Sequence, residues 1–284
     1  MPSTEGLRDV LAERIEATGF GAHGLHVRIG DDVAEHRWTP DVREEIHSVA
    51  KAVSVLAAGI AADEGLVSLD EPIARVASAC DPEITLRHLL TMTSGIDLPW
   101  SPTMMTDWPD LAAEFLSRPS RGRAFQYSNA STYTAMHVLS LRVGDIEEYL
   151  RPRLFAPLGL DDLAWSRCPN DRVLGGEGLS LRTEEMARLG LVIRDRGVWR
   201  GSRLVSAGIV DAMHSGWVDT GSATEGYRRY ALAGWDGPGS AWRLHGAYGQ
   251  LIVFAGDAVV TISADDHTGA DAIAAFVAKT ATGC

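Results

Sequence analysis

The strongest constraint on the fold is an apolar stretch from Val49 to Ala62, VAKAVSVLAAGIAA, whose only charge is Lys51. The stretch is shorter than the roughly 20 residues that a membrane-spanning helix needs. Ser48 precedes it, and Gly65 follows at a place where a glycine naturally ends a helix. A helix that is apolar on all sides is stable only when other elements cover it. We therefore predict a buried helix that begins at Ser48 and ends at Gly65.

The two ends of the chain carry the strand patterns that predict what covers this helix. After an amphipathic N-terminal helix, residues 24–38 alternate on either side of Gly30-Asp31-Asp32, which is typical of a β-hairpin. Near the C-terminus, strands joined by tight turns are predicted for RRYALAGWDG, AWRLHGAYG and QLIVFAGDAVVTISADD. Helices are expected over 182–197, with Thr183 as the N-cap, and over 269–280.

Between Leu66 and about Gly175 the strand patterns fade, and Pro and Gly separate short helical segments. We therefore expect an α/β fold of the α+β kind, in which an antiparallel sheet is flanked by terminal helices and a mainly helical domain is inserted. Residues 1–65 and 175–284 would form the α/β domain, and residues 66–174 the helical domain. The active site would lie in the cleft between the two.

Charge and cysteine content narrow the partners and the compartment. The net charge of -12 and the pI near 5.2 argue against nucleic acid or an anionic membrane as the main partner. Three cysteines, Cys80, Cys168 and Cys284, are odd in number and lack metal-binding spacing, so free thiols in a reducing compartment are expected. The N-terminus does not have the pattern of an export signal, which favours a cytoplasmic protein.

Lys51 is unusual because only two of the 26 basic residues are lysines, the other being Lys279. An arginine cannot lose its proton in a protein, whereas a buried lysine can. Positions i and i+3 lie on one face of a helix, so Ser48 and Lys51 would point into the same space as a nucleophile and its base. The alternative is that Ser48 caps the helix and Lys51 is a surface residue of its first turn.

Tyr127-Ser128-Asn129 precedes a second predicted helix. In one interpretation Ser128 or Asn129 caps that helix and Tyr127 packs beside it. In the other, the phenol of Tyr127 passes a proton to a leaving group and the amide of Asn129 holds the substrate.

The segment LHGAYGQ, residues 244–250, lies on a predicted strand near the C-terminus. Gly246 would let a substrate approach the backbone closely. The N–H of Ala247 could then form an oxyanion hole together with the N–H of Ser48. His245 by itself is as well explained as a structural strand residue.

The order of these three elements resembles the serine β-lactamase and penicillin-binding-protein superfamily, in particular the class C-like branch with family VIII esterases and 6-aminohexanoate-dimer hydrolases. Ser48-Val49-Ala50-Lys51 is similar to its S-x-x-K motif and Tyr127-Ser128-Asn129 to its Y-x-N motif. Further similar segments are EGLVSLDEPI, ITLRHLLTMTSGI, FAPLGLDDL and GGEGLSLRTEEMARLG. The resemblance covers most of residues 46–284 and implies a β-lactamase/transpeptidase-like fold.

The resemblance implies a serine hydrolase that works through an acyl-enzyme and needs neither a metal nor a cofactor. The implied catalytic residues are Ser48, Lys51 and Tyr127, and the implied substrate-binding residues are Asn129, His245, Gly246 and Ala247. The third motif of the family, K-T-G, aligns with Leu244-His245-Gly246, so the lysine that helps to bind a substrate carboxylate is absent. This departure favours a cytoplasmic esterase or amidase that acts on a small ester or amide.

Two other functions are consistent with the same residues. One is a β-lactamase or DD-peptidase that uses His245 in place of the missing lysine, and the other is a binding or regulatory protein that keeps the fold without turnover. The loop at 97–110 carries Trp100 and Trp108. Core packing is the more general role for such residues, but a Pro-rich segment is seldom core, so this loop is expected to form part of an apolar acyl pocket.

Overall fold

The computed structural model describes residues 3–98 and 109–282. The chain begins with helix α1 (Thr4–Thr18), whose N-cap Ser3 accepts a hydrogen bond from the N–H of Gly6. The hairpin β1 (Ala22–Ile29) and β2 (Asp32–Arg37) follows and turns at Gly30, whose φ of 57° suits a glycine. The predicted order of helix, strand and strand is confirmed.

An antiparallel sheet of eight strands forms the centre of the molecule, in the order β2-β1-β12-β11-β10-β9-β8-β7. Strand β1 pairs with β12, so the first and last strands of the chain lie side by side. The strands from the C-terminal part are β7 (Val218–Asp219), β8 (Arg229–Tyr230), β9 (Trp235–Asp236), β10 (Trp242–Gly246), β11 (Gln250–Ala255) and β12 (Ala258–Ala264). The predicted antiparallel sheet built from both ends of the chain is confirmed.

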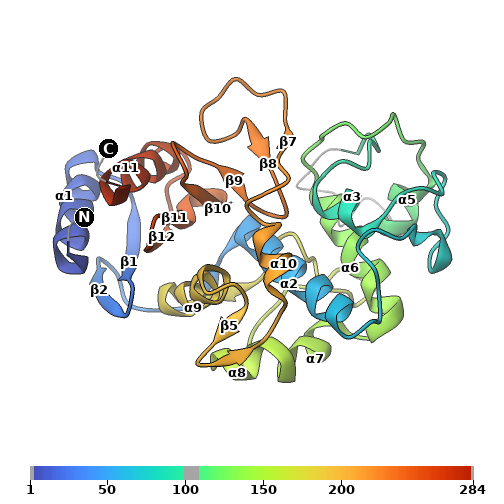
Figure 1. The fold of residues 1–284 in the computed structure, drawn as a ribbon, viewed down its shortest axis with the longest axis horizontal. Helices are drawn as coiled ribbons and strands as arrows, with labels where there is room; N and C mark the ends of the chain where they lie inside the picture. The colour runs from blue at the N-terminus through green and yellow to red at the C-terminus, as the bar shows by residue number, and fades with distance from the viewer. Residues whose placement is uncertain (1–2, 99–108, 283–284) are drawn as a thin grey trace.

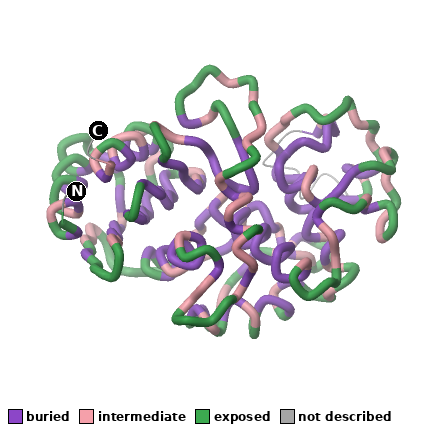
Figure 2. The backbone as a smooth tube through the Cα atoms, in the orientation of Figure 1, coloured by how far each residue is buried: buried purple, intermediate pink, exposed green. Residues whose placement is uncertain are grey.

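Helices cover both faces of this sheet. On one face α1 and α11 (Ala270–Thr282) lie next to each other and bury one apolar cluster against β1, β11 and β12 (Figure 1). On the other face, α2 (Ala50–Asp63) and α9 (Thr183–Arg194) contribute to a second, larger cluster. Every residue of α2 from Ala50 to Ala61 is buried, and the backbone around it is buried in Figure 2. The prediction of a buried central helix is therefore confirmed.

Short helices occupy the region between α2 and α9. They are η2 (Ile73–Arg75), α3 (Leu86–Leu90), α5 (Leu111–Ser117), α6 (Asn129–Val143), α7 (Ile146–Leu150), the π-helical η3 (Arg151–Phe155) and α8 (Ala156–Leu158). Their apolar side chains join the same cluster as α2, so this region and the sheet share one core. The division into domains at residues 65 and 175 stays a prediction.

The remaining elements are short and link these layers. Strand β3 (Glu44–Glu45) pairs with β4 (Ser180–Leu181), and β5 (Val198–Trp199) pairs with β6 (Ser202–Arg203). Helix α10 (Ala207–Asp211) follows β6. The β3–β4 pair brings the chain just before Ser48 close to the segment at 175–180.

Three local predictions differ from the structure. The N-cap of α9 is Arg182, and the hydroxyl of Thr183 instead forms a hydrogen bond of 2.7 Å with Ser263 Oγ on β12. Ser48 lies in a 3₁₀ turn, η1 (His47–Val49), that precedes α2. Strand β10 ends at Gly246, and Ala247–Gly249 form another 3₁₀ turn, η4, because the chain must reverse at once into β11.

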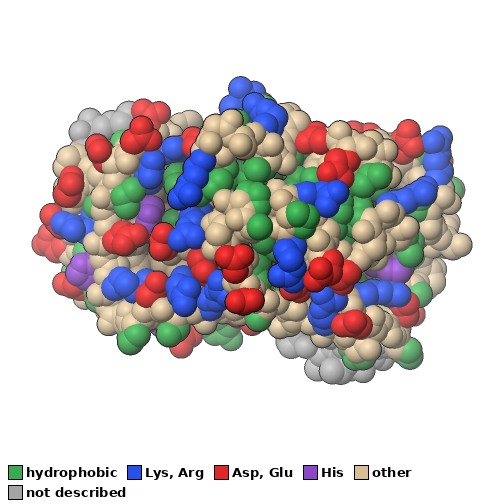
Figure 3. Space-filling view, turned by 90° about the horizontal axis from the view of Figure 1, so that it is seen from below, with side chains coloured by type: hydrophobic (Ala, Val, Ile, Leu, Met, Phe, Trp, Pro, Cys, Tyr) green, Lys and Arg blue, Asp and Glu red, His purple; other side chains and the backbone are tan. Residues whose placement is uncertain are grey.

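On the face of the molecule seen from below, basic and acidic side chains alternate instead of gathering by sign (Figure 3). Ion pairs are common among the described residues of the whole molecule, and Arg196 with Asp211 is an example. Cys80 and Cys168 are free thiols, while Cys284 lies outside the described residues. No helix within residues 3–98 and 109–282 has the length and apolar character needed to span a bilayer.

Candidate active site

The site is centred on the contact between Ser48 and Lys51. Lys51 is only 2% exposed, and its Nζ lies 2.8 Å from Ser48 Oγ. The N-cap of α2 is Val49, and no side chain caps the helix there. Ser48 therefore does not act as the cap and Lys51 is not a surface residue, so the structural alternative for this pair is wrong.

Two further oxygen atoms surround the Lys51 amine. Nζ lies 2.5 Å from Asn129 Oδ1 and 2.8 Å from the carbonyl oxygen of Gly176. It also lies 4.9 Å from the ring centroid of Tyr127, within the range of a cation–π contact. The structure thus brings together Ser48, Lys51, Tyr127 and Asn129.

Tyr127 and Asn129 owe their positions to the start of α6. Ser128 is the N-cap of this helix, and its hydroxyl donates to the carbonyl of Leu98 at 2.6 Å, as well as accepting from the helix. The predicted cap is confirmed for Ser128. The ring of Tyr127 packs against Trp235, with centroids 5.5 Å apart, which holds the phenol beside Lys51.

The amide of Asn129 is engaged at both ends by the protein. While Oδ1 accepts from Lys51, Nδ2 donates to Glu177 Oε2 at 2.8 Å, and the residue is 3% exposed. Only the second N–H of Nδ2 is left for a substrate. Sequence reasoning missed Glu177, because a single glutamate between two glycines carries no recognisable signal.

The N–H groups of Ser48 and Ala247 are the predicted donors of an oxyanion hole. Each residue lies in the first turn of a 3₁₀ helix, where the N–H groups have no acceptor within the helix. A Cβ atom at Gly246 would collide with the carbonyl of Ile46, so β10 packs closely against η1. Gly246 is therefore required for the close approach of these two segments.

Two residues with left-handed backbone flank the N–H groups of Ser48 and Ala247. His47 precedes Ser48 with a φ of 46°, and Tyr248 follows Ala247 with a φ of 59°. Such conformations are costly for residues other than glycine, and they are found often at functional sites. The sequence does not reveal them, because the type of a non-glycine residue does not by itself fix a positive φ.

The side chains of the third motif point to opposite faces of β10. Leu244 is 1% exposed in the core. The Nδ1 atom of His245 lies 2.9 Å from the hydroxyl of Tyr227, which donates to Asp271 at 2.9 Å. Asp271 also accepts from Arg243 Nη2 at 2.8 Å. Burial, reinforced by Arg243, lowers the pKa of His245 to about 4, so its ring is neutral near pH 7.

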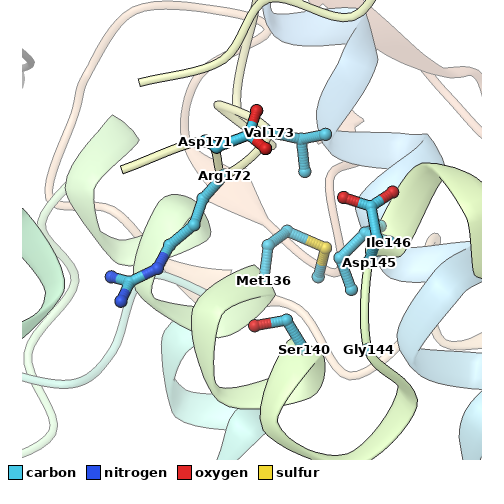
Figure 4. Close-up of a pocket in the computed structure, with 8 residues that line it drawn as sticks. All are labelled: Met136, Ser140, Gly144, Asp145, Ile146, Asp171, Arg172 and Val173. Atoms are coloured by element: carbon cyan, nitrogen blue, oxygen red, sulfur yellow. The ribbon is translucent and has the colours of Figure 1, made fainter. Parts of the chain in front are cut away.

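A cavity of about 230 Å³ lies between α6, α7 and the segment at 171–173 (Figure 4). Its charged side chains already have partners within the protein, since Asp145 binds Arg167 and Arg172 binds Asp110. The cavity shares no residue with the Ser48 group. The residues that line it are Met136, Ser140, Gly144, Asp145, Ile146, Asp171, Arg172 and Val173. We therefore place the chemistry at Ser48 and not here.

The loop that was expected to supply an acyl pocket carries Trp100 and Trp108. Both tryptophans lie outside the described residues. The other predicted substrate contacts, Asn129, His245, Gly246 and Ala247, stay predictions whose surroundings are those given above.

Comparison with known proteins places this geometry in context. The sequence model of the family described as Beta-lactamase matches residues 9–281. No curated protein sequence matches the chain.

Several solved structures share the fold. A putative β-lactamase from Bacteroides dorei superposes with a TM-score of 0.80 at 17% identity, covering 100% of both chains. A penicillin-binding-protein homologue from Caulobacter crescentus gives 0.77 at 15% identity, covering 97% of this chain and 96% of that one. A putative 6-aminohexanoate-dimer hydrolase from Bacillus anthracis gives 0.73 at 17% identity, covering 91% and 76%. These likenesses show a common fold.

Proposed function

The chain belongs to the Beta-lactamase family, and we propose that it is a serine hydrolase that cleaves a small ester or amide through an acyl-enzyme. The observation that carries this proposal is the contact of 2.8 Å between Ser48 Oγ and the buried amine of Lys51. A serine hydroxyl is a weak nucleophile unless a neighbouring base takes its proton. Lys51 Nζ is the amine within hydrogen-bond distance of Ser48 Oγ, which supports Lys51 as that base.

In the proposed reaction, Ser48 Oγ attacks the substrate carbonyl carbon while its proton moves to Lys51 Nζ. The N–H groups of Ser48 and Ala247 would stabilise the oxyanion that develops, at about 3 kcal/mol for each donor. When the tetrahedral intermediate collapses, the phenol of Tyr127 would give its proton to the leaving group and take up the proton held by Lys51, so both side chains return to their starting states. Water would then attack the acyl-enzyme with the same residues in reversed roles, and Ser48 would regain its proton.

The segment Leu244-His245-Gly246 supports a substrate that has no carboxylate next to this strand. Leu244 faces the core, and Arg243 on the same strand is bound by Asp271. His245 is neutral near pH 7 because burial holds its pKa at about 4. None of these three side chains offers a free positive charge. A neutral ester or amide therefore fits better than a penicillin or a peptide with a terminal carboxylate.

Intact-protein mass spectrometry tests the proposal directly. Wild type and Ser48→Ala are incubated separately with a fluorophosphonate and with a penicillin. We expect the fluorophosphonate to add to the wild type only, with no lasting penicilloyl adduct, and we expect turnover in a panel of esters and amides. A penicillin turnover assay checks that an adduct is not formed and lost quickly.

The two alternatives give different results in the same experiment. A stable penicilloyl adduct on Ser48, or rapid penicillin turnover, would indicate a penicillin-recognising enzyme. No labelling by either reagent would indicate a protein that binds without turnover, and the hydrolase proposal would then fail.

A further inference from the structure

We propose that Glu177 is a positioning residue for Ser48 and Lys51, which it reaches through the amide of Asn129. This inference rests on the proposed function. Three consecutive hydrogen bonds connect the residues: Ser48 Oγ to Lys51 Nζ at 2.8 Å, Nζ to Asn129 Oδ1 at 2.5 Å, and Asn129 Nδ2 to Glu177 Oε2 at 2.8 Å. A base that is itself oriented by a third group is a general arrangement in nucleophilic catalysis.

The carboxylate determines which way the Asn129 amide faces. An ionised carboxylate only accepts hydrogen bonds, so the amide must turn its NH₂ group toward Glu177. Its oxygen is then directed at Lys51 Nζ. Without the carboxylate the amide of Asn129 could rotate. Its NH₂ group would then face the amine of Lys51, which must accept the proton of Ser48.

This orientation leaves one direction for proton transfer. A neutral amine has two N–H groups and one lone pair. If Lys51 donates to Asn129 Oδ1 and to the Gly176 carbonyl, its lone pair faces the hydroxyl of Ser48. On attack the O–H bond of Ser48 breaks, a third N–H bond forms at Nζ, and Oγ bonds to the substrate carbon. No atom of Lys51 has to move.

Glu177 would also stabilise the cation that this transfer creates. Its negative charge is separated from Nζ by one amide group, so it attracts the ammonium ion without forming a direct ion pair with it. A direct pair would favour a protonated Lys51 before the reaction. Because the carboxylate attracts an ammonium ion in the same way before and after the transfer, its removal should change both the acylation rate and the dependence of that rate on pH.

The backbone around Glu177 is held firmly at the site. The carbonyl of Gly176 binds Lys51, and the N–H of Gly178 donates to Glu45 Oε1 at 2.8 Å. The carbonyl of Glu177 itself accepts from Trp165 Nε1 at 3.0 Å. Since the residues on both sides are fixed, the carboxylate is held against Asn129 and is not a mobile surface group.

The test measures two single-turnover reactions of Ser48 from about pH 5 to pH 10, phosphonylation by a fluorophosphonate and acylation by a para-nitrophenyl ester. Glu177→Gln keeps the size and loses the charge, Glu177→Asp keeps the charge, and Glu184→Gln is a control on exposed α9 surface. We expect Glu177→Gln to acylate about 10- to 100-fold more slowly. The rise of its rate with pH should also have a midpoint at lower pH, because the ammonium ion has lost a stabilising charge. Glu177→Asp should recover part of the rate.

Two outcomes would overturn the proposal. In the first, Glu177→Gln is acylated at the wild-type rate at every pH. In the second, its acylation rate is lower by the same factor at every pH, which is the result expected of a purely structural residue. Thermal unfolding of each variant checks that the fold is kept. A wild type that is not acylated at Ser48 would contradict the proposed function instead, so the two failures are distinguishable.

Discussion

The ring of Tyr248 packs against the imidazole of His47, with centroids 5.0 Å apart, although 201 positions separate them in the chain. His47 precedes Ser48 and Tyr248 follows Ala247, so this contact joins the two segments that carry the proposed oxyanion donors. Both residues have left-handed backbone, which other contacts must hold in place.

We predict that Tyr248→Gly lowers kcat for a neutral ester about tenfold and leaves KM nearly unchanged, because the donors act mainly on the transition state. Glycine suits the φ of 59°, so the backbone is not strained by the change. Tyr248→Phe keeps the ring and serves as the control, with an expected kcat within about twofold of wild type. Steady-state kinetics give kcat and KM for wild type, Tyr248→Gly and Tyr248→Phe. An unchanged kcat in the glycine variant would contradict the prediction.

Lys51→Arg should lower the acylation rate by about 10²- to 10⁴-fold, because a guanidinium stays protonated and cannot accept the proton of Ser48. The same change at Lys279, the only other lysine and an exposed residue of α11, provides a matched control that should react normally. Stopped-flow acylation by a chromogenic ester measures both. Near-normal acylation by Lys51→Arg would show that Lys51 is not the base.

The third motif predicts discrimination against an anionic leaving group. We compare the acetyl esters of para-hydroxybenzamide and para-hydroxybenzoate, with each rate divided by that of spontaneous hydrolysis. The carboxylate of the benzoate ester would lose its bound water on entering the site. It would gain no cationic partner from this motif, because Arg243 is already bound by Asp271 and Leu244 is apolar. The neutral ester should have a kcat/KM about tenfold higher. A preference for the carboxylate would point to a cationic group at the site and toward penicillin-like substrates.

The stability of the fold should depend on pH through His26 on β1. This residue is 6% exposed, and burial lowers its pKa from 6.5 to about 4, with smaller effects of Glu184 and Arg28. Between pH 4 and pH 6.5, His26 is protonated in the unfolded chain and remains neutral in the folded protein. The free energy of unfolding therefore falls as the pH falls from 6.5 to 4.

His26→Leu should therefore flatten this part of the curve by about 3 kcal/mol. Urea unfolding of wild type and variant at several pH values gives the difference curve. A variant whose curve runs parallel to that of the wild type would show that His26 does not carry the effect.

The contact between Ser48 and Lys51 could be predicted from the sequence because it is local. Two residues three positions apart in a helical turn lie on the same face. Because the residues around Lys51 are apolar, the helix is buried and Lys51 is buried with it. The cap at Ser128 could be predicted for the same reason. Such features depend on neighbours in the chain and not on the rest of the fold.

The contacts that escaped prediction join distant segments. Glu177 meets Asn129 only because the β3–β4 pair carries the segment at 175–180 to the site. The reversal after AWRLHGAYG was predicted, but β10 ends at Gly246, three residues before the end of the predicted strand, because Ala247–Gly249 form the turn. Thr183 has the residue type of a cap, but Ser263 on β12 takes its hydroxyl.

The distance along the chain between Ser48 and Ala247 also has a consequence for synthesis. A ribosome adds Ser48 long before Ala247, whose N–H would complete the proposed oxyanion hole between β10 and β11. Under the proposed mechanism, a nascent chain that ends before β10 would carry a serine that cannot yet attack a carbonyl efficiently. Fragments from stalled translation or from proteolytic clipping before β10 would then be inert, so hydrolysis would report that β10 and β11 had been synthesised.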